Sequence, residues 1–165
     1  MKDKIVKLIN AAWFPGILIL MALAVFSLVV FLQQPAPEKT AAGGQGTLTV
    51  TVSGIRNTKG NIIICLYRAG PLTDLTNIAD AREIASTGNT ASAVFSGVSF
   101  REYAVFVLHD ENGNRITDTG PDGVPIEGMG ITGAPISAAQ KPEFASSKFL
   151  FNQPALAIEI PLTYW

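Results

Sequence analysis

From residue 47 onward, apolar and polar residues alternate with a period of two, which is the spacing of a β-strand with one buried face. Leu48, Val50 and Val52 fall on one face of the segment Thr47–Val52, and three threonines fall on the other. Asn61–Tyr67 is apolar on both faces, so a more central strand is expected there. Further strands are predicted at Ser92–Val98, Tyr103–Leu108, Lys148–Phe151 and Ala155–Ile160.

The segments between these strands carry turn and loop signals. Gly70–Gly88 contains Pro71 and scattered polar residues and is expected to be a loop with a short helix near Ile78–Ile84. Gly120–Lys141 is rich in Gly and Pro and has no sustained period, so it is expected to be a long surface excursion. Pro161 should place the end of the last strand at a sheet edge. Short strands with little helix predict an all-β fold, an antiparallel β-sandwich.

The chain begins with a different pattern, an uncharged apolar run over residues 11–32. At about 1.5 Å per residue, a helix of this run would reach roughly 33 Å, enough to cross the hydrocarbon core of a membrane. Lys2, Lys4 and Lys7 precede the run, and the next basic residue is Lys39. The positive-inside rule then leaves the N-terminus in the cytoplasm and exports the remainder, on the periplasmic or extracellular side.

This N-terminal pattern predicts one transmembrane helix that either stays as an anchor or is removed as a signal segment. The segment that follows it is rich in Pro, Gly and Ala and has no large apolar side chain, which is typical of a tether. Three regions are therefore expected: a membrane anchor or signal segment at 1–32, a linker at 33–46 and a β-sandwich domain at 47–165.

Charge and cysteine content narrow the function classes. The chain has 12 Lys and Arg and 13 Asp and Glu; three lysines and one aspartate precede residue 33, which leaves 9 basic and 12 acidic residues in the exported part. A mildly acidic domain argues against nucleic acid as a partner, because that binding depends on clustered cations. Cys65 is the single cysteine, so an intramolecular disulfide is excluded, and it is expected to be a buried small hydrophobe.

One loop carries the strongest chemical signal. It places side-chain oxygens at alternate positions, through Asp110, Asn112 and Asn114, followed by Asp118. With the backbone carbonyl of Ile116, these residues could ligate Ca²⁺, which takes 6–8 oxygen ligands. The twelfth position of a helix-flanked calcium loop would be Pro121 instead of Glu. The same side chains could also bond their own backbone in an ion-free turn, and both interpretations stay open.

This loop belongs to a longer signature that resembles a family of exported bacterial proteins with a domain of unknown function. The matching residues are Tyr103-Ala104, His109-Asp110-Glu111-Asn112-Gly113-Asn114, Asp118 and Gly123-Val124-Pro125-Ile126-Glu127-Gly128-Met129-Gly130. The resemblance extends over most of the chain from Thr47 to Tyr164. It implies a β-sandwich similar to immunoglobulin-like or transthyretin-like modules, and it implies no defined activity.

Two functions from different classes follow. The first is a membrane-tethered binding or structural module of the cell envelope, with its Asp/Asn loop organised by Ca²⁺ or by its own hydrogen bonds. Its partners would be the membrane and an unknown envelope ligand or protein. The second is an envelope hydrolase or accessory enzyme that uses His109, Asp110 and Glu127. The first is preferred because one histidine with no recognisable nucleophile leaves few catalytic mechanisms. Under this first hypothesis, His109 is a residue at the end of a strand that pins the loop by a ring hydrogen bond.

Overall fold

The computed structural model describes residues 43–133, 135–137 and 141–165. The chain divides into two units between Thr40 and Ala41, and all described residues belong to the second, Ala41–Trp165. The predicted anchor at 1–32 lies outside the described residues, as does most of the predicted linker. Within the described part, none of the helices has the length and apolar character needed to cross a membrane.

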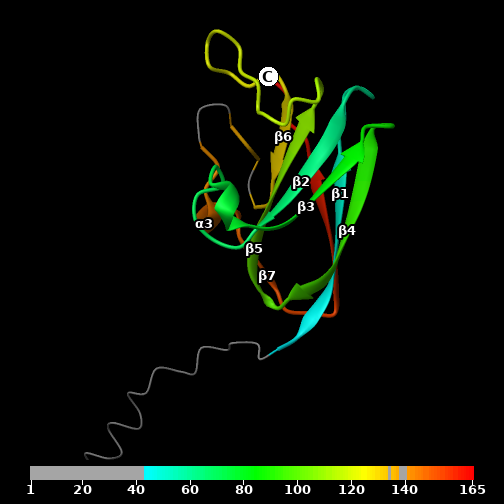
Figure 1. Cartoon of the computed structure of the whole chain (residues 1–165), viewed down its shortest axis with the longest axis vertical. Helices are drawn as coiled ribbons and strands as arrows, with labels where there is room; N and C mark the ends of the chain where they lie inside the picture. Colours follow the sequence, from blue (N-terminus) through cyan, green and yellow to red (C-terminus); the bar gives the residue numbers. More distant parts are fainter. Residues whose placement is uncertain (1–42, 134, 138–140) are drawn as a thin grey trace, which may run out of the picture. The chain divides into compact units, whose positions relative to one another are not determined.

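The second unit consists of strands with very little helix (Figure 1). Its described elements are β1 (Gln45–Ser53), β2 (Asn61–Tyr67), a 3-10 turn η1 (Leu75–Asn77), β3 (Ile78–Ala85), β4 (Thr90–Ser99), β5 (Arg101–Asp110), β6 (Gly128–Ile131), α3 (Phe144–Ser147), β7 (Phe149–Phe151) and β8 (Ala155–Pro161). The six predicted strands are all present, and the all-β prediction is confirmed.

The strands form two sheets. The smaller sheet has the order β4-β1-β8, and the larger one runs β3-β2-β5-β6, with β7 paired to the first residues of β5. All pairs are antiparallel except β1 with β8, which is parallel. The expectation of a purely antiparallel sandwich was therefore wrong at this pair, because the last strand returns beside the first one in the same direction.

The core lies between the two sheets. Leu48, Val50 and Val52 of β1 are fully buried, as the alternation predicted, and each contributes about 1.5–3 kcal/mol by leaving water. They pack with alternate residues of the larger sheet such as Ile62, Ile64 and Val107. β2 lies between β3 and β5, which confirms its predicted central place. On the other face of the larger sheet, Leu72 from a loop and Phe144 from α3 cover part of the strands.

Two predicted loops contain strands instead. Ile78–Ala85 was expected to hold a short helix but forms β3, antiparallel to β2. Gly128–Ile131, expected inside a surface excursion, forms β6 beside β5. Glycine is required in β6 because a Cβ on Gly128 would lie 2.3 Å from the Tyr164 ring, and one on Gly130 would lie 2.7 Å from Ile160. The glycines that made this segment look irregular thus allow the chain to pack closely on itself.

Candidate functional site

The Asp/Asn loop follows the end of β5, at the same end of the sandwich as the C-terminus (Figure 1). Asp110 is the last residue of β5 and is completely buried. Its Oδ1 accepts the N–H groups of Gly113 (2.8 Å) and Asn114 (3.1 Å), and its Oδ2 accepts that of Arg115 (2.8 Å). A buried carboxylate that receives three N–H bonds organises the whole turn around itself.

The next side chains of the loop bond to one another. Asn112 and Asn114 both donate their side-chain N–H groups to Oδ2 of Asp118, at 2.9 Å in the case of Asn114. Their own oxygens accept main-chain N–H groups two residues further on, from Asn114 at 3.0 Å and from Ile116 at 2.8 Å. The loop is thus closed by Asx turns and a shared carboxylate.

The five predicted calcium ligands lie in one loop, and four of their side chains, those of Asp110, Asn112, Asn114 and Asp118, take part in hydrogen bonds inside it. Each amide oxygen that accepts one N–H keeps a second lone pair, so this bonding alone does not decide between the two interpretations. Among the residues that the structure describes, no three His, Cys, Asp or Glu side chains are grouped as a metal ion would need. That finding does not test a site whose ligands include two asparagines and a carbonyl.

Glu127 lies beneath the loop and is 3% exposed. Its Oε1 accepts the N–H of Glu111 (3.0 Å) and its Oε2 accepts that of Asp118 (3.1 Å). Burial, together with the nearby charges of Asp118 and Asp110, raises the pKa of Glu127 despite these two bonds. This carboxylate thus connects the two ends of the Asp/Asn loop, at Glu111 and Asp118.

His109 is fully buried and bonded through both ring nitrogens. Nε2 lies 2.9 Å from the main-chain oxygen of Lys59, and Nδ1 lies 2.7 Å from the Tyr164 hydroxyl. Since a carbonyl oxygen only accepts, Nε2–H donates to the main-chain oxygen of Lys59. The two ring bonds reach the C-terminal segment and the β1–β2 turn, and neither partner belongs to the Asp/Asn loop, so the role of His109 in pinning that loop stays a prediction.

A second group of side chains, which the sequence did not single out, joins the same segments. The Nε of Arg56 donates to Glu111 (2.6 Å), Asn57 donates to the other oxygen of Glu111 (3.0 Å), and the Arg56 guanidinium lies 4.5 Å from the centre of the Tyr164 ring. Burial works to raise the pKa of Glu111, but the bonds from Arg56 and Asn57 outweigh it and lower that pKa. These residues are far apart in the chain, so no local motif could reveal them.

The proposed catalytic residues do not face a common open space. His109, Asp110 and Glu127 are at most 3% exposed; Asp110 and Glu127 both accept main-chain N–H groups of the Asp/Asn loop, whereas the His109 ring bonds Lys59 and Tyr164. A general base must reach a substrate proton at hydrogen-bond distance, and none of the three can do so without the fold opening. Throughout the described residues, every buried side-chain nitrogen or oxygen has a partner.

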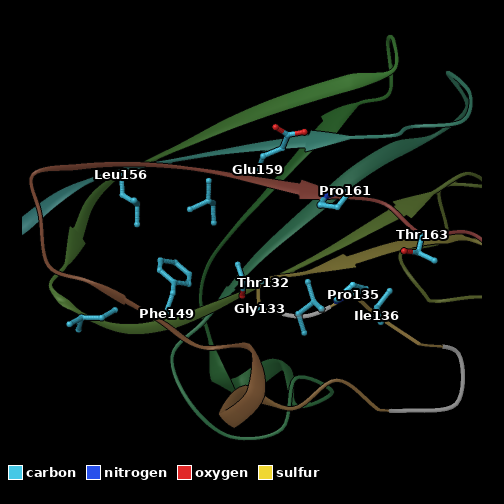
Figure 2. Close-up of a pocket in the computed structure, with 12 residues that line it drawn as sticks. Thr132, Gly133, Pro135, Ile136, Phe149, Leu156, Glu159, Pro161 and Thr163 are labelled. Carbon is cyan, nitrogen blue, oxygen red and sulfur yellow. The ribbon is translucent and has the colours of Figure 1, made fainter.

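An open apolar groove lies elsewhere, between the β8 edge of the smaller sheet and β6 and β7 of the larger one. We call it the edge groove. It has a volume of about 560 Å³, and its apolar lining includes Ile131, Pro135, Phe149, Leu150, Leu156 and Ile158. Figure 2 shows the Leu156 and Phe149 side chains pointing into the same space from β8 and β7, and the Glu159 carboxylate pointing away from it. No sequence signal indicated this groove, because it depends on how the two sheet edges are spaced.

Comparison with known proteins places the chain in one family. No curated protein and no solved structure matches it. A family profile described as "Uncharacterized protein conserved in bacteria (DUF2141)" matches residues 50–159, a range that includes the first five residues of β8, the buried His109 and the whole Asp/Asn loop. The chain therefore belongs to this bacterial family.

Proposed function

We propose that the protein is an envelope-exposed, membrane-tethered module that binds a ligand in the edge groove. The tether and the export are supported by the basic N-terminus and the uncharged run at 11–32. The binding role is carried by one observation, the apolar groove of about 560 Å³ between two sheet edges. That volume falls within the range of ligand pockets, roughly 300–1,000 Å³.

The side chains that line the edge groove favour a binding function over a catalytic one. The groove lining offers Thr132, Thr163 and a single carboxylate, Glu159, which is too little for general acid–base work. The carboxylates near the Asp/Asn loop, those of Asp110, Glu111 and Glu127, instead accept hydrogen bonds that connect the loops. A scaffold with one rigid, hydrogen-bonded end and an open apolar side fits a module that presents a surface to a partner.

Site-specific photo-crosslinking in bacterial cells tests this proposal on the full chain. A benzophenone amino acid in place of Leu156, which lines the groove, should crosslink to an envelope component. The matched control carries it in place of Val94, which is 51% exposed on β4 and lies outside the groove. Absence of crosslinks from position 156, or an identical pattern from both positions, would contradict the proposal. Membrane fractionation of the same cells tests the tether, which predicts retention in the membrane fraction.

A calcium-organised loop is a second candidate, supported by one backbone feature. Arg115 has φ +60° and is the one non-glycine residue with positive φ in the described part of the chain. Counted from Asp110, it stands at the sixth position, where calcium loops require a sharp turn that glycine usually makes. Thermal melting of the full chain with millimolar Ca²⁺ or with chelator tests this candidate. A calcium-dependent rise in Tm that Asp118→Asn abolishes supports it, and no change contradicts it.

A further inference from the structure

The two sheets of the sandwich are unequal along the edge groove. The smaller sheet ends at β8, whereas the larger one continues through β6 and β7. Leu156 and Ile158 of β8 therefore stay half-buried and line the groove, and Leu156 faces Phe149 of β7 across an uncovered space. One further strand paired to β8 would extend the smaller sheet and cover this space, so the groove can accommodate an added strand.

The hydrogen-bonding groups of β8 define what could occupy that position. Thr47 donates its N–H to the oxygen of Pro154, and Leu162 donates to that of Ser53, both at 2.9 Å. In a parallel ladder, alternate residues bond to the partner strand, so the even-numbered residues of β8 face β1. The odd-numbered residues Ala155, Ala157 and Glu159 direct their N–H and C=O groups outward, to the groove side.

These outward groups are free within the described part of the chain. Ala155, Ala157 and Glu159 are exposed, and their main-chain groups make no hydrogen bond to any described residue. An unpaired strand edge is a template for another strand. An added strand would gain main-chain bonds from the edge and would place every second side chain in the groove, as in β-augmentation.

We infer that the edge groove binds an extended, uncharged segment of a partner protein with apolar residues at alternate positions. This inference rests on the proposed binding function and names its ligand class. Glu159 is the single charged residue of the lining and points away from the groove, so recognition depends on backbone pairing and apolar side chains. Pro161 has no N–H and ends the pairing edge, which limits the bound strand to roughly five to seven residues.

A synthetic peptide serves as the probe because the natural partner is unidentified. Its sequence, Thr-Leu-Thr-Val-Thr-Val-Ser, copies Thr47–Ser53 and has apolar residues at alternate positions. Binding of the labelled peptide to the full chain in lipid nanodiscs is measured by fluorescence anisotropy. Two further peptides carry N-methyl groups on the odd or on the even residues, so that each has one blocked hydrogen-bonding edge. One of them should bind like the parent and the other at least 10-fold more weakly.

Substitutions in β8 provide the second part of the binding test. Ala157→Pro removes an outward N–H without touching the ladder to β1 and should weaken peptide binding at least 10-fold, while Ala157→Val keeps the N–H and should bind within about twofold of wild type. Equal binding of both N-methylated peptides, or no binding of the parent at millimolar concentration, would overturn the inference. Dimerisation of the full chain that Ala157→Pro abolishes would also overturn it, since the occupant would then be a second copy. If these tests fail while Leu156 still crosslinks in cells, the binding function stands and only the ligand class is wrong.

Discussion

Replacement of Asp110 by alanine removes the central acceptor of the Asp/Asn loop. The wild-type carboxylate is completely buried and receives three main-chain N–H bonds of 2.8–3.1 Å. A hydrogen bond to a charged group contributes about 1.5–3 kcal/mol net, so three bonds set an upper range of roughly 4.5–9 kcal/mol. Gly113, Asn114 and Arg115 are exposed, so their N–H groups can partly return to water.

We therefore expect Asp110→Ala to lower the free energy of unfolding by about 4 kcal/mol, which corresponds to roughly 15 °C in Tm for a unit of this size. Urea titration of the wild type and the variant, followed by circular dichroism, measures the difference. Asp122→Ala is the matched control, because Asp122 is exposed and accepts a single N–H, from Val124 at 3.1 Å; it should cost about 0.5 kcal/mol. A loss below about 1 kcal/mol for Asp110→Ala would refute the view that this carboxylate organises the loop.

Three further predictions concern single side chains. Tyr164→Phe leaves the buried Nδ1 of His109 without its 2.7 Å partner and should cost about 1–3 kcal/mol in thermal unfolding; a change in Tm below 2 °C would count against the network. The pKa of Glu111 is lowered from 4.5 by the bonds from Arg56 and Asn57, which outweigh its burial. Its charge therefore stabilises the fold above pH 4.5, and this contribution is lost as the pH falls through the lowered pKa. Glu111→Gln should thus lose less stability than the wild type between pH 5 and pH 3 in urea titrations, and parallel curves would contradict this. Burial raises the pKa of the Cys65 thiol, so an aromatic disulfide reagent at pH 8 should react with it slowly in the folded protein and at once after unfolding.

The parts of the fold that follow from local pattern could be predicted from the sequence. The alternation of apolar and polar residues correctly located β1 and its buried face, because successive side chains of a strand point to opposite faces of the sheet. β3 was missed because Asp80 and Arg82 occupy the positions between its two isoleucines, so pairing with β2 decides its conformation. β6 was missed because the glycines that permit its close packing are also loop signals. Propensity gives way to tertiary contacts in both cases.

The same division holds for the site. The Asx turns of the loop from Asp110 to Asp118 follow from residue types at short spacing, whereas the ring bonds of His109 to Lys59 and Tyr164 join residues far apart in the chain. The Arg56–Glu111–Tyr164 contacts and the edge groove depend on segments far apart in the chain, and a single sequence carries no record of such pairs. The open edge of β8 depends equally on strand order: Pro161 indicated an edge strand, but not which strands would face it.

Residue-resolved hydrogen exchange of the full chain, followed by NMR, tests the central claim most directly. That claim is that β8 has one paired edge and one free edge beside an apolar groove. The N–H groups of Leu156, Ile158 and Ile160 should be protected by β1, whereas those of Ala155, Ala157 and Glu159 should exchange orders of magnitude faster and become protected when the peptide is added. Uniform protection of all six N–H groups in the unliganded protein would mean that the edge is already covered, and would contradict the account.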